Sequence, residues 1–544
     1  MSKTRFWRKR DFWRKISLGL LSILLLALIL AWISNDFRFD ASFEVARVIS
    51  FLSVIIIGAG ILWLGWWIID KEPKPSWLAW LLIGAVFLRL TLGVLWTLVL
   101  PVYGYNSPVE KAGYVLKDAY ARDTAAWDLA KSNKPLWKIF TMTNSSDQYG
   151  GLLFFSSFIY RFLGGSVHQP LLIVVLAACC SSLVVIFTWG FVRRIFKLRA
   201  ANVAAIALAF YPEAVLLGSS QMREAFTMTF VALAFYGLVY YYQQYLRTGL
   251  MWTLSALLLT WLFSPPFAAM LLISLVLIAL FLDADAKREK RLLRRKEVWI
   301  TLAVLSVLMI LGIWLGWSNI VPKGIHNIVE LVNWWLRKVA VYQTDLSKQV
   351  SGWLQREFKR VPSELFMPLV IIYGILRPFL PATLVAYSQP VWYGLSIIRA
   401  IGWSIMLLSL IYATLKLIFN RNRRIKRGLL LMICAIVWVS ILIASIRGGG
   451  DQWDNPRYRM IFISLQMTLA AWVWSGQKRL VSSDLRRVLI AACFFFVWFI
   501  PWYVRRYYDF QWQVISIFHT IGLGLASAVL YLIWDKARSK KERP

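Results

Sequence analysis

Cysteine, histidine and acidic residues are scarce in this chain. Its 544 residues include four cysteines and three histidines, and 27 Asp and Glu stand against 61 Lys and Arg. The cysteines lie within apolar runs and no Cys-x-x-Cys pair occurs, so the sequence indicates neither a disulfide framework nor a redox motif. The histidines are His168, His326 and His519, too far apart to suggest a histidine metal site. We therefore predict no cofactor; a divalent metal ion would suit the chemistry below, but no clear ligand set supports one.

The sequence also has no phosphate-binding P-loop, no internal repeat and no segment typical of a water-soluble domain. The glycine triplet at 448–450 lacks the Lys and the Ser or Thr of a P-loop. A formal net charge of +34 would suggest nucleic acid as the partner of a soluble protein. Here 59% of the residues are hydrophobic, and the basic residues gather in short segments between apolar runs. This positive-inside pattern predicts contact with membrane lipids and no nucleic acid partner.

Long apolar runs determine the predicted fold class. Runs of about 20 apolar residues can cross a bilayer as helices, so we expect an all-α polytopic integral membrane protein with about fourteen spans. We place these spans at about 16–34, 47–69, 77–100, 168–192, 201–218, 225–242, 251–264, 266–282, 298–317, 390–418, 429–446, 460–476, 486–503 and 513–534. The basic loops 283–297 and 420–428 and both termini are predicted to be cytoplasmic. We expect the plasma (inner) membrane.

Two further apolar segments are ambiguous between spans and shorter elements. Residues 149–165 carry Arg161, and residues 366–386 contain three prolines. Counting either segment as a span would move a basic cluster to the outer side. The charge rule therefore favours a helix at the outer interface for the first segment and a re-entrant element for the second.

The sequence suggests three parts. Residues 1–76 form a two-helix membrane segment, and residues 476–544 form another with a basic cytoplasmic tail. Residues 77–475 form a membrane catalytic module with two long outer loops, 102–167 and 318–389. Within the second loop, residues 318–365 have apolar residues at helical spacing against Lys and Arg, as in a helix lying on a surface.

The first outer loop contains two candidate catalytic carboxylates. Read as a helix, its middle places Tyr120 and Trp127 on one apolar face, with Asp123 between them. A buried acid with a raised pKa suits a proton acceptor, whereas a helix in a solvated loop would give Asp123 no special role. Asp118 lies about 140° around the helix from Asp123. For Asp118 the simpler interpretation is an exposed ion pair with Arg122.

Three other polar clusters are predicted to face the same outer side. They are residues 147–151 after the first loop, residues 211–224 between two spans, and residues 448–459 between two later spans. Each has a simpler explanation: Arg223 and Glu224 could stabilise a helix end, and Arg457 and Arg459 could bind lipid headgroups. A charge at the bilayer centre, however, costs about 2.5–3.5 kcal/mol on insertion scales. Charges gathered on one face therefore predict a functional site.

Arginines and carboxylates together suit transfer from a lipid phosphate. Arginine binds phosphate bidentately, and an aromatic ring such as Tyr458 can pack on a sugar or an apolar chain. A sugar linked to a lipid phosphate is an activated donor, because its leaving group is a stabilised anion. Transfer then needs a base for the acceptor hydroxyl and cations for the leaving phosphate.

These motifs resemble the GT-C superfamily of membrane glycosyltransferases, which use polyprenyl-phosphate sugars. Members typically carry an essential acid in the first outer loop beside a juxtamembrane helix, and the order Asp123, Trp127, Ala130 is similar to that pattern. The segment 151–164 resembles the second juxtamembrane helix, residues 211–224 resemble the second outer loop with its auxiliary acid, and 455–459 (NPRYR) resembles a late Arg-Tyr motif near the lipid phosphate. The usual Asp-Glu dipeptide and the Pro-Pro before the juxtamembrane helix are absent.

The resemblance implies a role for each candidate residue. The base is assigned to Asp123 with Asp118 as second choice, the auxiliary acids to Glu213, Glu224 and Asp147, and the donor phosphate to Arg457, Tyr458, Arg459 and Arg223. The implied reaction is inverting transfer of a sugar from a polyprenyl-phosphate donor to a hydroxyl of a glycan, lipid or protein acceptor on the extracytoplasmic face.

Two other classes fit the same composition. A transporter or flippase of lipid-linked glycans would need charges at the membrane midplane and often has inverted repeats. Arg89 and Arg399 are the main midplane charges of this sequence. A glycan polymerase or ligase would also have basic outer loops, which the segment 318–365 provides.

Overall fold

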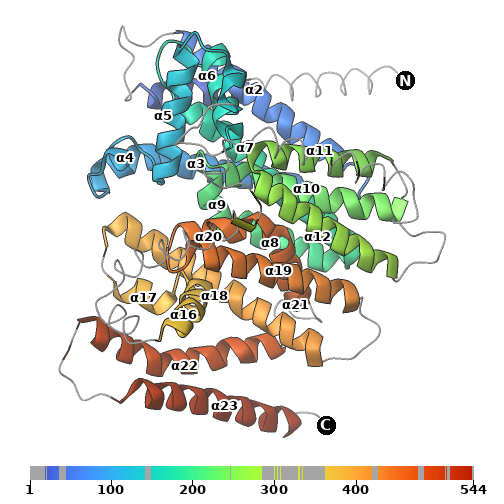
Figure 1. The fold of residues 1–544 in the computed structure, drawn as a ribbon, viewed down its shortest axis with the longest axis vertical. Helices are drawn as coiled ribbons and strands as arrows, with labels where there is room; N and C mark the ends of the chain where they lie inside the picture. Colours follow the sequence, from blue (N-terminus) through green and yellow to red (C-terminus); the bar gives the residue numbers. More distant parts are fainter. Residues whose placement is uncertain are drawn as a thin grey trace, which may run out of the picture.

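The protein is described by a computed structural model. The described ranges are residues 21–35, 45–140, 149–244, 247–284, 362–386, 388–419, 427–475, 483–508 and 515–541, with a few isolated positions besides. Every regular element in these ranges is a helix (Figure 1). Long apolar segments form helices because a helix satisfies every backbone hydrogen bond within the segment itself. The all-α prediction is confirmed.

The described helices fall on either side of the gap before residue 362. The first set comprises α2 (Val45–Ile68), α3 (Trp77–Tyr103), α4 (Pro108–Lys111), α5 (Lys117–Lys131), η1 (Leu136–Phe140), α6 (Gly151–Leu163), α7 (Leu171–Ile195), α8 (Leu198–Ala209), α9 (Pro212–Gly218), α10 (Arg223–Gln244), α11 (Arg247–Phe263) and α12 (Pro265–Ala284). The second comprises α16 (Ser363–Leu376), α17 (Leu380–Val385), α18 (Pro390–Phe419), α19 (Arg427–Gly448), α20 (Asp454–Arg459), η4 (Met460–Phe462), α21 (Ile463–Trp474), α22 (Ser483–Tyr508) and α23 (Ile517–Lys541).

Nine of the described helices are long and apolar enough to cross a membrane, which confirms a polytopic protein. They are α2, α3, α7, α10, α12, α18, α19, α22 and α23. The predicted span at 201–218 is not one straight helix: α8 and α9 are bent by 55°, and together they would make a tenth span. Pro212 starts α9, and proline cannot continue a helix because it lacks the backbone N–H. The predicted span at 298–317 lies outside the described ranges, so the count of fourteen stays a prediction.

Helix α7 forms the centre of the molecule. Its apolar stretch is buried throughout, and α2, α3, α8 and α10 pack against it. Small residues allow the close approach that helices need in lipid. A Cβ added at Gly58 of α2, for example, would lie 2.8 Å from Sγ of Cys179 in α7.

The two ambiguous segments are interrupted or short in the structure. Helix α6 has 13 residues, which span about 20 Å, less than the roughly 30 Å of a bilayer core. It packs against α5. Residues 366–386 form parts of two helices, α16 and α17, separated by residues 377–379. The predicted spans at 251–264 and 266–282 correspond to α11, which ends at Phe263, and α12, which begins at Pro265.

The arrangement of the spans brings several loops to one end of the bundle. The chain enters α10 at Arg223 and leaves α19 at Gly448, and Arg457, shortly after the end of α19, contacts Asp118 of α5. In Figure 1, α4 and α5 lie to the left, whereas the carboxyl ends of α10 and α12 lie to the right. The C-terminal hairpin of α22 and α23 packs on α17 and α18. The three-part division of the chain remains a prediction.

Candidate active site

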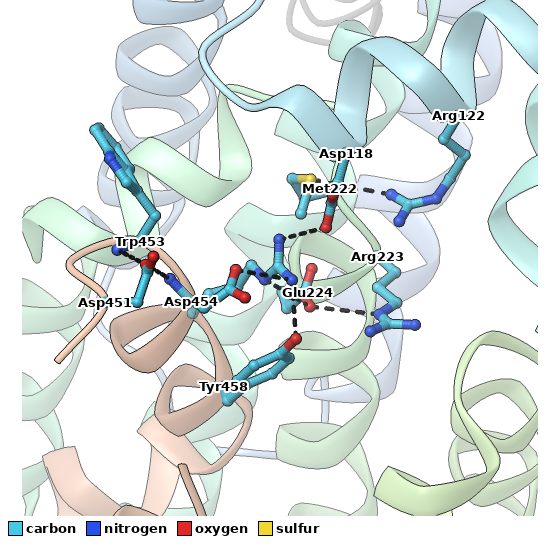
Figure 2. Close-up of polar contacts among 10 residues, drawn as sticks. Asp118, Arg122, Met222, Arg223, Glu224, Asp451, Trp453, Asp454 and Tyr458 are labelled. Carbon is cyan, nitrogen blue, oxygen red and sulfur yellow. Dashed lines mark hydrogen bonds and ion pairs between the residues drawn. The ribbon is translucent and has the colours of Figure 1, made fainter. Parts of the chain in front are cut away.

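The candidate site forms where the start of α5, the start of α10 and the short helix α20 converge (Figure 2). At its centre is Arg457, which is 5% exposed. Its Nη1 donates a hydrogen bond of 2.9 Å to Oδ2 of Asp118. Its Nη2 lies 3.2 Å from Oδ1 of Asp454 and its Nε lies 3.5 Å from Oε1 of Glu224. One guanidinium therefore contacts carboxylates from three separate elements.

Local structure fixes the position of Arg457. The carboxylate of Asp451 accepts hydrogen bonds from the backbone N–H groups of Trp453 and Asp454, at 2.6 and 2.7 Å, and so shapes the turn that starts α20. The side-chain amide of Asn455 donates to the carbonyls of Gly374 and Gly449, at 2.7 Å each. Asn455 thus fastens α20 to α16 and to the end of α19.

A glycine is required in this turn. The backbone of Asn455 approaches Gly448 so closely that an added Cβ would lie 2.7 Å from the amide nitrogen of Asn455. The following Gly449 has a φ of 46°, a conformation that glycine adopts readily. The glycine triplet therefore forms a close-packed turn that carries α20.

Glu224 is the most deeply buried acid of the site. It has no exposed surface, and its Oε1 lies 3.4 Å from Nε of Arg223 as well as near Arg457. It stands in the first turn of α10, where the positive end of the helix dipole favours a carboxylate. Oε2 of Glu224 has no hydrogen-bond partner among the described residues. Two arginines and a helix start thus compensate this buried charge.

Aromatic rings border the arginines. The guanidinium of Arg223 lies 5.2 Å from the centre of the Tyr149 ring and 5.8 Å from that of Phe267. The Tyr458 hydroxyl accepts a 3.0 Å hydrogen bond from Nη2 of Arg457, and its ring lies 6.4 Å from that of Phe267. The site therefore offers cations for an anionic group and apolar ring surface for a hydrocarbon chain attached to that group.

The three arginines act on the protonation of Asp118. Its side chain is 51% exposed. Partial burial, the largest single influence, acts to raise the pKa of Asp118, but Arg457, Arg122 and Arg223 together lower the pKa below its usual value. Burial raises the pKa of Asp454, with Arg457 offsetting part of the rise. Asp118 is therefore the ionised, accessible carboxylate of the cluster.

Asp123 has a different environment from the one predicted. It is 2% exposed, so its burial is as expected. Both of its oxygens are already bonded, however: the hydroxyls of Tyr114 and Tyr160 donate to Oδ2 and Oδ1 at 2.6 Å each, and Nε2 of His168 lies 2.9 Å from Oδ2. Burial and the adjacent charge raise the pKa of both phenols, so they remain donors. Asp123 holds α5 to α6 and to the segment before α7.

Other predicted site residues lie apart from Arg457. Glu213 is buried and forms a two-point ion pair with Arg399 of α18, at 2.7 and 2.9 Å. Arg459 is 1% exposed and its guanidinium lies 3.3 Å from the centre of the Trp403 ring. The structure places both away from the cluster around Arg457. Asp147 lies outside the described residues.

The structure thus pairs Asp118 with Arg457, where the sequence suggested an exposed pair with Arg122. Arg122 is buried, and its Nη1 lies 3.9 Å from Sδ of Met222. Sequence reasoning also missed Asp454, whose position three residues before Arg457 was the available signal. Among the described residues, no group of three or more His, Cys, Asp or Glu is arranged to hold a metal ion.

No protein-family model and no curated protein sequence matches the chain. Three similar solved structures are of the archaeal oligosaccharyltransferase from Archaeoglobus fulgidus: AglB in complex with an inhibitory peptide and a dolichol-phosphate (12% identity), the apo form (14%), and a form tethered to an acceptor peptide (13%). Each has a TM-score of 0.41 and covers 84% of this chain. The chain spans 55 to 56% of their length. A likeness at this level does not identify the reaction.

Proposed function

We propose that this protein is a membrane glycosyltransferase of the GT-C type. It transfers a sugar from a polyprenyl-phosphate donor to an acceptor hydroxyl on the extracytoplasmic face of the plasma membrane. The ion pair of Asp118 and Arg457, at the end of apolar helices and beside the buried Glu224, is the observation that carries the proposal. Asp118 provides a half-exposed carboxylate that can act as the base. Arg457, which contacts it, provides a buried cation that can bind an anion.

Arg457 and Arg223 bind the donor phosphate. Both are buried, and aromatic rings flank them for the apolar part of the donor. Arginine suits this role because its planar fork matches phosphate oxygens and stays charged when buried. As the bond between the sugar and the phosphate oxygen breaks, the negative charge grows on the leaving phosphate, and fixed cations stabilise it there.

Asp118 is the proposed base, in place of Asp123. The acceptor oxygen attacks the anomeric carbon from the side opposite the phosphate, the proton of the hydroxyl moves to Asp118, and polyprenyl phosphate leaves with the bonding electron pair. The configuration at the anomeric carbon is inverted. Asp123 is unsuited to this step because its oxygens are occupied by two phenols and a histidine.

Donor binding would also activate the base. Without donor, Arg457 lowers the pKa of Asp118, which weakens Asp118 as a proton acceptor. A phosphate bound at Arg457 competes for the same guanidinium N–H groups. Its negative charge then raises the proton affinity of Asp118, so the carboxylate becomes a stronger base only when the leaving group is in place.

A transporter fits the geometry less well. The two midplane arginines named from the sequence are buried among helices: Arg89 is 0% and Arg399 3% exposed. Arg399 is engaged by Glu213 and by the carbonyl of Gln452, and Nη1 of Arg89 donates to the carbonyl of Ala85. Both side chains are thus enclosed within the described part of the chain.

Binding of polyprenyl phosphate to the purified protein in lipid nanodiscs tests the proposal. Losing a hydrogen bond to a charged group costs about 1.5–3 kcal/mol, so Arg457→Ala should bind roughly tenfold to hundredfold more weakly. Lys117→Ala is the matched control, because it removes a positive charge next to Asp118 from an exposed side chain that is not part of the cluster. Equal affinity in wild type, Arg457→Ala and Lys117→Ala would overturn the donor site.

A further inference from the structure

A cavity lies beside the cluster around Arg457. It has a volume of about 370 Å³ and is lined by the segment before α5, by α17, by the start of α18 and by residues 452–453. Small-molecule sites in proteins typically measure about 300–1,000 Å³. Two lining residues belong to segments that lead into the cluster: Val115 lies three residues before Asp118, and Trp453 lies directly before Asp454. The cavity therefore borders the segments that carry Asp118 and Asp454.

The lining combines aromatic rings with polar groups that have no partner. Four aromatic side chains contribute to it: Tyr105, Trp392, Tyr393 and Trp453. The side chains of Ser388, Ser396 and Gln452 also line it, and none of them makes a side-chain hydrogen bond within the described part of the chain. Rings that pack against C–H faces, beside free hydroxyl and amide groups, are the chemistry that recognises a carbohydrate.

The aromatic wall is rigidly held. Nε1 of Trp392 donates a 2.9 Å hydrogen bond to Oε1 of Glu110, and Oε2 of Glu110 accepts from the backbone N–H of Tyr105 at 2.6 Å. The Trp392 and Trp453 rings meet edge to face at 5.3 Å, and Arg399 lies over Trp453 at 4.3 Å. The protein would therefore lose little conformational entropy when a ligand binds here.

The charged groups of the cavity argue against other ligands. Both oxygens of Glu110 are bonded, and Nε of Arg377 donates to the carbonyl of Gly450 at 2.8 Å. A phosphate would meet one partly engaged arginine and one carboxylate, a poorer site than that around Arg457. An acyl chain would desolvate the free hydroxyl and amide groups without replacing their hydrogen bonds, which is unfavourable.

We infer that this cavity is a subsite for a carbohydrate unit of the acceptor, and that the acceptor is a glycan. A sugar ring held against Trp453 and Gln452 would lie beside the segments that lead into α5 and α20. The assignment to the acceptor rests on the transfer reaction proposed above, whereas carbohydrate binding in the cavity does not depend on that reaction.

Saturation-transfer NMR on the protein in nanodiscs tests the inference without any lipid-linked substrate. The probes are glucose, galactose, mannose, their N-acetylamino derivatives and maltotriose. We expect a signal for at least one probe, with loss of that signal in Ser396→Phe, which fills the cavity, and weakening in the milder variant Gln452→Ala. Ile398→Phe is the control: it adds the same ring to α18 at a side chain that is 56% exposed, and it should leave the signal unchanged.

The outcomes separate this inference from the proposed function. No signal from any probe, or a signal that survives in both cavity variants, overturns the carbohydrate subsite. A polyprenyl-phosphate hexose that displaces the free sugar would show that the donor sugar occupies the cavity, which overturns the acceptor assignment. Failure of polyprenyl phosphate to bind would instead contradict the donor site at Arg457 and leave the sugar measurement valid.

Discussion

Nη1 of Arg457 lies 2.9 Å from Oδ2 of Asp118, although the two residues are 339 positions apart in the chain. This contact joins the first turn of α5 to α20. The same arginine reaches Glu224 at the start of α10 and Asp454 within α20. A single guanidinium therefore connects α5, α10 and α20.

Asp118→Asn should abolish sugar transfer while the protein stays folded. The amide keeps the shape of the side chain but cannot accept the proton of the acceptor, and loss of a general base costs about 10²–10⁴-fold in rate. Mass spectrometry of membrane lipids gives the measurement, because cells producing the variant should accumulate the unused polyprenyl-phosphate sugar. Asp128→Asn, at an exposed position on the same helix, is the control. Normal transfer by Asp118→Asn would exclude this residue as the base.

Asp123→Asn should lower the stability of the protein more than the rate of sugar transfer. The amide can accept through one oxygen only, so one of the two phenols that now donate to Asp123 would lose its acceptor in a buried place. Leaving a buried donor unsatisfied costs about 1–3 kcal/mol. The melting temperature in detergent should fall, and Asp128→Asn again serves as the comparison. Full stability combined with loss of transfer would instead restore Asp123 as the base.

The activity should depend on pH through the arginines around Asp118. Arg122 helps to lower the pKa of Asp118, and a carboxylate with a lowered pKa stays ionised at lower pH. Arg122→Gln should raise that pKa, so less of the base is ionised at a given acidic pH. The acid limb of the pH–activity profile should therefore move to higher pH. Lys117→Gln changes charge by the same amount at an exposed site and should move the limb little; equal shifts in both would contradict the assignment.

The Glu213–Arg399 pair should prove structural. Glu213→Gln leaves the buried guanidinium of Arg399 without its counter-charge, and breaking a buried pair typically destabilises by about 3–5 kcal/mol. Replacing both partners by apolar residues, Glu213→Leu with Arg399→Met, should recover much of that loss. Thermal unfolding of the single and double variants gives the comparison. A double variant that folds well but transfers no sugar would contradict a purely structural role for this pair.

The sequence by itself determined the local features of this protein. Apolar runs predicted membrane helices because backbone groups in lipid must be satisfied within each segment. Helical phase placed Asp123 on the buried face of α5 and Asp118 on the other side, which agrees with exposed fractions of 2% for Asp123 and 51% for the Asp118 side chain. These features depend only on neighbouring residues.

The tertiary structure alone decided which acid meets Arg457. The sequence predicted that Asp118 faces solvent, whereas in the structure it faces α20, more than 300 residues later in the chain. The turn at Gly448–Gly450 and the side chain of Asn455 hold α20 in this position. Likewise the partners of Asp123, Tyr160 and His168, come from elements outside its own helix. A sequence pattern gives the face on which a side chain lies, whereas the group opposite that face depends on how distant helices pack, and helix packing does not follow from local periodicity.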